Sequence, residues 1–256
     1  MPLVVAALAA LLGAGLTFFS GFGLGTLLLG VLVLFLPPAV AIAVTAVVHL
    51  LNNLFKLGLV GRNTAWPVVV RFGVPAIVGA FAGARVLDAL GEAAPLATYT
   101  LAGAVREIAP VKLAIGLLLV AFAVFEVTPL RRAALAPSLL PVGGLLSGFF
   151  GGLSGHQGAL RSVFLLRAGL SKDAFIATGV AIAVLIDVTR LWAYAADLRT
   201  LDWRALGPLV GACSLAAFAG SYLGSRLLPK LTYTAVQRAV AALLLVVGLG
   251  LASGLL

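Results

Sequence analysis

The chain has 256 residues, of which 62% are hydrophobic and 10% are charged, and its mean hydropathy is +1.20. Soluble domains carry about 25% charged residues, so the composition excludes a typical water-soluble protein. Lys and Arg number 17 against 8 Asp and Glu, which gives a net charge of +9. These basic residues are scattered along the chain without a stripe or tail, which argues against a nucleic-acid-binding protein and favours contact with lipid headgroups or with an anion.

Apolar runs recur from one end of the chain to the other. A membrane-spanning helix needs about 20 mostly apolar residues. The run at residues 1–19 has no Lys or Arg before it, so we expect a membrane segment there and not a cleaved signal peptide. The sequence predicts an all-α, multi-pass membrane protein. Its further predicted spans or near-spans are residues 40–59, 68–87, 113–127, 175–196, 205–228 and 236–256.

An internal repeat is the strongest sign of how the chain is organised. Trp66 precedes the sequence Ala-Phe-Ala-Gly at 80–83, and Trp203 precedes the same sequence at 217–220. The offset is the same for both features (203 − 66 = 217 − 80 = 137), which chance would rarely produce. The sequence therefore predicts two related repeats of about four to five apolar segments each.

The join between the repeats is marked by prolines and adjacent arginines at residues 129–137. We place the boundary at Pro137, which gives a first transmembrane repeat at 1–136 and a second at 137–256. An odd number of spans in each repeat would invert the second repeat relative to the first, and an even number would leave them parallel. The distribution of Lys and Arg leaves both arrangements open.

Each repeat opens with a glycine-rich stretch, at 20–25 and at 147–158. Glycine weakens a helix by about 1 kcal/mol relative to alanine, so we expect broken or re-entrant helices at both places. Such breaks at membrane depth need protein or a water-filled cavity around them, and paired glycine breaks indicate a transporter's substrate site. Close helix packing is the alternative role of glycine, and we prefer it for 79–83 and 220–224.

Ionisable side chains inside membrane segments cost about 2.5 to 3.5 kcal/mol each on insertion scales, so each is a functional candidate. In the second repeat, Asp187 and Arg190 lie one turn apart, either as an intrahelical ion pair or as part of a pathway. They correspond to Asn53 and Lys56 at an offset of 134 (187 − 53 = 190 − 56 = 134). In the first repeat, four polar residues lie on one face of a predicted helix, because they follow the first of them by three, four and seven positions. They are His49, Asn52, Asn53 and Lys56.

The second glycine-rich opening contains the densest polar cluster of its repeat. If a helix restarts after Gly155, Gln157 and Arg161 share a face, and the free N–H groups at its start can meet an anion. His156 is able to carry a proton near neutral pH. The alternative is that His156 and Arg161 lie at the membrane interface beside lipid headgroups.

Residues 152–155 also fit the Gly-x-Ser-Gly pattern of intramembrane serine proteases. Such an enzyme needs a histidine base from a later helix, whereas His156 is two residues from Ser154 and His49 precedes it. A serine hydrolase using Ser154 is therefore a distant alternative. The sequence has no Walker motif and no His or carboxylate cluster suited to a transition metal, so we expect neither ATP-driven transport nor a metal cofactor.

The two glycine-rich openings, the Trp to Ala-Phe-Ala-Gly repeat, the segment 174–178 and above all the run at 147–158 resemble the TauE/SafE sulfite exporter family, also called the TSUP membrane transporters. The first opening has Thr26 after Gly25 in place of the family's more usual glycine-rich run. The resemblance implies a secondary transporter, an exporter of sulfite or organosulfonates in the inner membrane, without an organic cofactor. A carrier of another small carboxylate, a metabolite or a cation stays open.

We predict that the two broken openings meet near the middle of the bilayer and that one half moves against the other to give alternating access. The anion gradient or coupled protons would drive the transport. Gln157, Arg161 and free backbone N–H groups are predicted to bind the anion. The full set of predicted substrate-site residues is Ser154, His156, Gln157 and Arg161 in the second opening, with His49, Asn53, Lys56 and Arg190 along the route.

Overall fold

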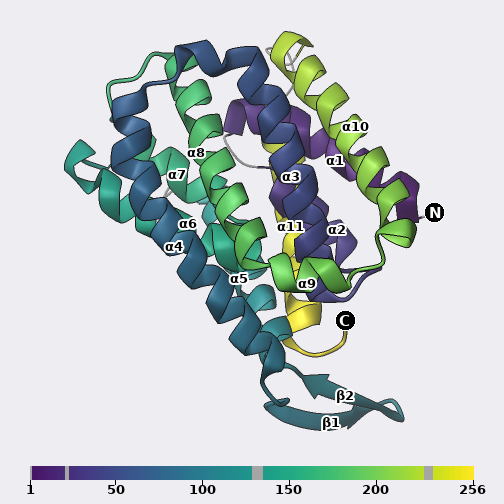
Figure 1. Ribbon diagram of the computed structural model, residues 1–256. Helices are drawn as coiled ribbons and strands as arrows, with labels where there is room; N and C mark the ends of the chain where they lie inside the picture. Colours follow the sequence, from purple (N-terminus) through teal and green to yellow (C-terminus); the bar gives the residue numbers. More distant parts are fainter. Residues whose placement is uncertain (1, 21–22, 129–134, 228–232) are drawn as a thin grey trace.

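The structure, a computed structural model, describes residues 2–20, 23–128, 135–227 and 233–256 (Figure 1). It is a bundle of helices with one small β-hairpin, which agrees with the predicted helical membrane protein. Residues 129–134 of the predicted join, together with Gly21 and Phe22, lie outside the described residues. The helices are α1 (Pro2–Ser20), α2 (Leu24–Leu32), α3 (Pro38–Val60), η1 (Gly61–Asn63), α4 (Trp66–Glu92), α5 (Pro110–Val127), η3 (Pro137–Leu139), α6 (Leu140–Ser154), α7 (Gly158–Leu165), α8 (Lys172–Ala193), α9 (Ala195–Thr200), α10 (Trp203–Leu227) and α11 (Tyr233–Ala252).

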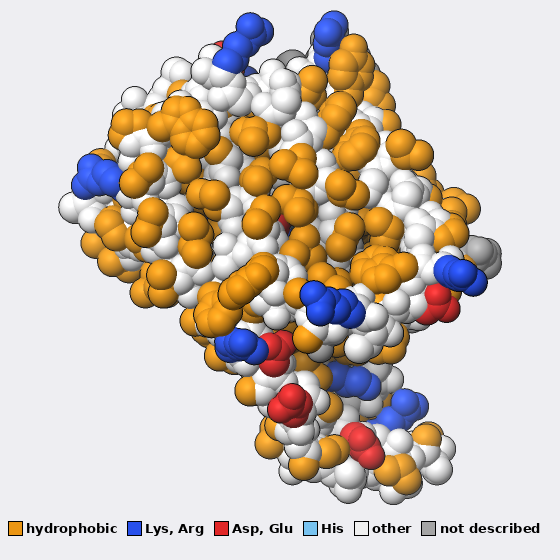
Figure 2. Space-filling view, in the orientation of Figure 1, with side chains coloured by type: hydrophobic (Ala, Val, Ile, Leu, Met, Phe, Trp, Pro, Cys, Tyr) orange, Lys and Arg blue, Asp and Glu red, His pale blue; other side chains and the backbone are white. Residues whose placement is uncertain are grey.

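Within the described ranges, four helices are long and apolar enough to cross a membrane: α3 with η1, α4, α8 and α10. Shorter apolar stretches lie in α1, α5 and α11. Proline stands in the first turn of α3, α4 and α5, where its missing N–H costs no helical hydrogen bond and its fixed φ favours the helix. On the face shown in Figure 2, hydrophobic side chains cover the middle, while charged side chains gather at the edges and around the hairpin end.

The helices α3 and α8 lie side by side in the centre of the bundle and run in opposite directions. The start of α3 and the end of α8 line one common cavity, which places them at the same end of the molecule. Around this central pair, α4 packs against α6, α10 packs against α1, and α5 packs against α11. Each of these outer contacts therefore joins an early helix to a late one.

Glycine makes the outer helix contacts close. A Cβ atom at Gly83 of α4 would collide with the carbonyl of Phe149 in α6, and one at Gly220 of α10 would collide with the carbonyl of Leu11 in α1. The packing role expected for 79–83 and 220–224 is thus what the structure shows. Gly152 of α6 has the same role, because its Cβ would collide with the backbone of Ala80.

The second glycine-rich opening is less broken than its composition predicts. Residues 147–154 are helical and continue α6 to Ser154, since several of their glycines are used for close packing against α4. The break is confined to residues 155–157, where Gly155 adopts the left-handed region with φ +84°. The expected helix break is therefore present but starts eight residues later than the opening itself.

A β-hairpin that the sequence analysis did not predict joins α4 to α5. Its strands β1 (Ala97–Leu101) and β2 (Ala104–Ile108) pair antiparallel around a two-residue turn at Ala102 and Gly103, both with positive φ. The Tyr99 hydroxyl donates a hydrogen bond to the carbonyl of Ser253 at 2.5 Å. The hairpin projects from one end of the bundle and is fastened to the chain's C-terminal segment (Figure 1).

Candidate functional site

The carboxylate of Asp187 in α8 is the centre of a buried polar cluster. Its Oδ2 accepts a hydrogen bond from Asn53 Nδ2 at 2.8 Å and lies 2.7 Å from His49 Nδ1. Its Oδ1 accepts from Gln157 Nε2 at 3.0 Å and lies 2.9 Å from Arg190 Nη2. Asp187 and Arg190 both have 0% exposure. A buried carboxylate is tolerated only when it is paired and hydrogen-bonded, and here four side chains provide this.

Helical spacing brings these side chains together. His49, Asn53 and Lys56 follow one another by four and three positions on α3, and all are buried. This face points toward α8. The sequence predicts such an orientation, because a polar face of a membrane helix should turn away from lipid. Asp187 and Arg190 are spaced by three positions on α8, and the ion pair expected between them is present.

The helix break between α6 and α7 is fastened to α8 from two sides. Arg190 Nη1 donates to the carbonyl of Gly151 at 3.5 Å, and the Tyr194 hydroxyl donates to the carbonyl of Gly152. From α6, Ser147 Oγ donates to the carbonyl of Gln157 in the break at 2.8 Å. The carbonyl groups of Gly152 and Gln157 thereby find hydrogen-bond donors inside the protein, as membrane burial requires.

The two glycine-rich openings meet at this break. A Cβ atom at Gly25, in the first turn of α2, would lie 3.3 Å from the carbonyl oxygen of Gly155 and 3.5 Å from the His49 ring. A Cβ atom at Gly155 would lie 2.7 Å from Arg190 Nη1. Glycine at both positions lets the start of α2, the end of α6 and the Asp187 cluster approach one another.

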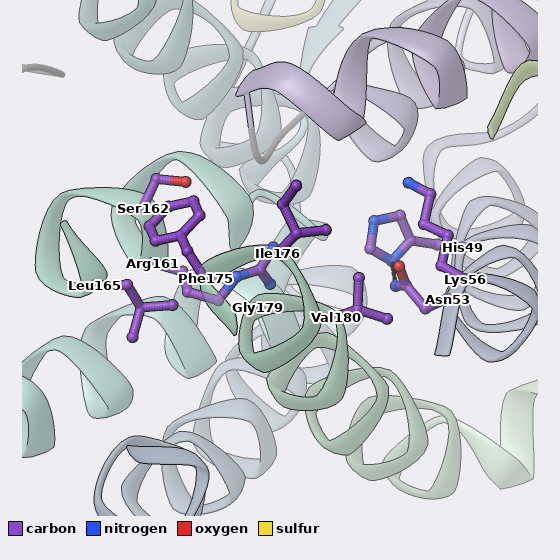
Figure 3. A pocket seen from close by; sticks show the side chains of 10 residues that line it. All are labelled: His49, Asn53, Lys56, Arg161, Ser162, Leu165, Phe175, Ile176, Gly179 and Val180. Carbon is purple, nitrogen blue, oxygen red and sulfur yellow. Dashed lines mark hydrogen bonds between the residues drawn. The ribbon is translucent and has the colours of Figure 1, made fainter. Parts of the chain in front are cut away.

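A cavity of about 40 Å³ adjoins the cluster between α3, α7 and α8. In Figure 3 the side chains of α3 stand on one side, those of α7 on the other, and those of α8 between them. Arg161 in the cavity wall donates from Nη1 to Oε1 of Gln157 at 3.4 Å, and Gln157 in turn binds Asp187. The polar lining residues are His49, Asn53, Lys56, Arg161 and Ser162.

Basic side chains outnumber acidic ones around this cavity. Among the residues that the structure describes here, Lys56 and Arg161 line the cavity, and Arg190 pairs with the carboxylate of Asp187 in the adjoining cluster. All four side chains are at least nine-tenths buried. A buried excess of positive charge is costly unless an anion compensates it, so the arrangement suits an anionic ligand.

The predicted site residues fall into three groups. His49, Asn53, Lys56 and Arg161 line the cavity, while Gln157 and Arg190 bind Asp187. Ser154 is the last residue of α6, and His156 lies in the break. Asp187 was not among the predicted site residues and was expected either to pair with Arg190 or to belong to a pathway. Its correspondence with Asn53 at an offset of 134 is the sequence signal that it meets the other half.

His156 reaches Ser154, contrary to the expectation that two neighbouring positions are poorly placed for such a contact. Ser154 and His156 are close along the chain, yet the left-handed Gly155 between them brings Ser154 Oγ to 3.0 Å from His156 Nδ1. Ser154 Oγ is also 3.2 Å from the carbonyl of Phe150, to which it donates, and the His156 ring stacks on Phe122 with centroids 4.9 Å apart. Both side chains are buried beside the helix break and do not line the cavity described above.

The fold and the cluster define a class of protein: a multi-pass helical membrane protein that buries polar and basic side chains around a cavity between broken helices. Residues 5–251 match the family described as Sulfite exporter TauE/SafE, and the chain belongs to this family. Members of the family are membrane transporters of sulfur-containing anions and not enzymes. No curated protein and no solved structure gives a significant match to the chain.

Proposed function

We propose that this protein is a secondary exporter of small sulfur-containing anions, with sulfite as the first candidate, in the inner membrane. The observation that carries the proposal is the excess of basic side chains around the buried cavity: Lys56, Arg161 and Arg190 against Asp187. The cavity of about 40 Å³ has room for a few water-sized groups, which suits a compact oxyanion.

The cavity residues have the chemistry that an oxyanion needs. Arg161 offers a planar set of N–H donors and Lys56 offers a compact positive charge, and both bind oxyanions through charge-assisted hydrogen bonds. Asn53 and His49 stand on the opposite wall and supply further polar groups. Asp187 binds Gln157 and Arg190, and through it these two residues position His49 and Asn53. The contact between Ser154 and His156 stabilises the helix break.

The repeats at 1–136 and 137–256 are proposed to be inverted. Asn53 and Asp187, which correspond at offset 134, touch each other, as corresponding residues near a twofold axis do. The helices that carry them, α3 and α8, run in opposite directions. The pairing of α4 with α6 is mirrored by that of α10 with α1. Inverted repeats around a central site are a common basis of alternating access, in which one half rocks against the other.

The test is transport of radiolabelled sulfite in liposomes that contain the purified protein, with sulfoacetate, sulfate and acetate as competitors. We expect saturable sulfite flux that sulfoacetate inhibits more strongly than acetate does. A matching experiment with an imposed pH gradient distinguishes coupled protons from a simple anion gradient as the driving force.

Absence of flux for every anion, in vesicles shown to be sealed and loaded, would contradict the proposal. It would favour a carrier of cations or neutral metabolites. Flux inhibited by acetate but not by sulfoacetate would instead indicate a carboxylate carrier.

A further inference from the structure

A second cavity, of about 610 Å³, lies at the end of the bundle where α3 begins and α8 ends. It is formed by the first turns of α3, the last turns of α4, and the junction of α8 with α9. We call it the vestibule. Its wall carries side chains of both charges, including Arg85 and Asp88, which lie 3.6 Å apart. The basic side chains of the central cavity do not line the vestibule.

The helix α8 connects the two cavities in a fixed order. Gly179 and Val180 line the central cavity, Asp187 and Arg190 follow within the polar cluster, and Tyr194 comes after them in the vestibule wall. At 1.5 Å per residue, the distance along the helix from Gly179 to Tyr194 is about 22 Å. The central cavity and the vestibule therefore lie on opposite sides of the polar cluster.

Tyr194 stands between the vestibule and the cluster. Its side chain is 4% exposed and packs in an apolar core that includes Leu153 of α6. Its hydroxyl donates a hydrogen bond to the carbonyl of Gly152, next to the Gly151 carbonyl that Arg190 binds. The ring thus bridges α8 and the end of α6 at the level where the vestibule stops.

We propose that the vestibule is the second access chamber of the transport path and that Tyr194 is the residue that closes it from the anion site. Breaking the hydrogen bond to Gly152 and turning the ring aside joins the vestibule to the Asp187 cluster. The same movement releases the contact of Tyr194 with the end of α6, while the contacts of Arg190 with Gly151 and of Asp187 with Gln157 remain. This inference rests on the proposed function, because it assumes that a solute crosses the cluster.

The test measures access and not transport. The chain has one cysteine, Cys213, which is fully buried, so the Cys213→Ser chain is a background without thiols. Single cysteines are then placed by Val180→Cys in the central cavity and by Ala196→Cys in the exposed wall of the vestibule. A membrane-impermeant anionic methanethiosulfonate is added to the side from which the Ala196→Cys chain reacts, and the rates of modification are compared.

We expect the Val180→Cys chain to react slowly from the vestibule side when Tyr194 is present. Tyr194→Ala should raise this rate by about tenfold or more, and Tyr194→Phe, which keeps the ring but loses one hydrogen bond, should raise it by about threefold. The Ala196→Cys chain should react at the same rate in all three backgrounds. This control shows that the reagent reaches the vestibule equally well in all three backgrounds.

Equal rates for the Val180→Cys chain with Tyr194 and with Tyr194→Ala would overturn the inference, and so would a lack of reaction in both. If Tyr194→Ala raises the rate of modification of the Val180→Cys chain but no anion is transported, the role of Tyr194 as a gate is supported and the proposed substrate is wrong. If anions are transported while Tyr194→Ala leaves the rate of labelling unchanged, the proposed function stands and the gate is wrong.

Discussion

Asn53 and Asp187 lie 134 positions apart in the sequence, yet Asn53 Nδ2 donates to Asp187 Oδ2 at 2.8 Å. This contact joins α3 to α8 in the middle of the bundle, beside the cavity that Lys56 and Arg161 line. Asp187 also accepts from Gln157 in the helix break, so one carboxylate joins α8 to α3 and to the break before α7. The cluster is therefore both a structural link and the wall of the proposed anion site.

Asp187→Asn is expected to destabilise the protein and to abolish transport. The substitution leaves the buried Arg190 guanidinium without its carboxylate, and breaking a buried ion pair in this way costs about 3 to 5 kcal/mol. Thermal unfolding of the purified protein and sulfite flux in liposomes measure the two effects. Adding Arg190→Gln should recover part of the stability but not the flux, and recovery of both would refute a role for the pair in transport.

Arg161→Gln is expected to weaken sulfite transport without affecting membrane insertion. Hydrogen bonds to charged groups contribute about 1.5 to 3 kcal/mol, so the KM for sulfite should rise by about tenfold or more. Arg167→Gln is the matched control, because Arg167 is exposed just beyond the end of α7. Equal kinetics for the two variants would remove Arg161 from the anion site.

Combined neutralisation of Lys56, Arg161 and Arg190 separates an anion carrier from a cation carrier. The triple variant, with Gln at each position, should lose saturable anion flux, because the remaining charge of Asp187 repels anions from the cavity. The protein must first be shown to be inserted and monodisperse. Undiminished flux in this variant would favour transport of a cation or a neutral metabolite.

Gly155→Ala is expected to destabilise the helix break. The left-handed φ of +84° costs a non-glycine residue about 1 to 2 kcal/mol, and the new Cβ would lie 2.7 Å from Arg190 Nη1. Gly211→Ala is the control, because Gly211 lies within α10 with open space around it, and alanine there should be neutral or stabilising by about 0.4 to 1 kcal/mol. The free energy of unfolding should therefore fall for Gly155→Ala and stay the same or rise for Gly211→Ala, and a similar stability for both would show that the break tolerates a side chain.

Local sequence features predicted much of the fold and part of the site. The apolar runs indicated the spans, and the spacing of His49, Asn53 and Lys56 predicted one buried polar face on α3. The break at Gly155 followed from helix propensity, but its extent did not, because glycine serves both helix breaks and close packing. Gly152 packs closely against α4 and does not break the helix. This contact joins segments far apart in the chain, so a local sequence pattern does not predict it.

Long-range contacts account for what the sequence did not predict. Asp187 receives its partners from α3 and from the residue before α7, at separations of 138, 134 and 30 positions. The β-hairpin at 97–108 was missed because its strands are short and lie between two stronger helical patterns. Two short runs with strand-forming residues flank the pair Ala102 and Gly103, which is typical of a β-hairpin. Apolar runs alone do not reveal this pattern.

The most direct test of the central claim is calorimetric titration of the purified protein with sulfite, compared with the double variant Lys56→Gln, Arg161→Gln. We predict saturable binding at one site in the unsubstituted protein and in the Arg167→Gln control, and no measurable binding in the double variant. Binding of equal strength in all three proteins would contradict the claim that the cavity between α3, α7 and α8 is the anion site.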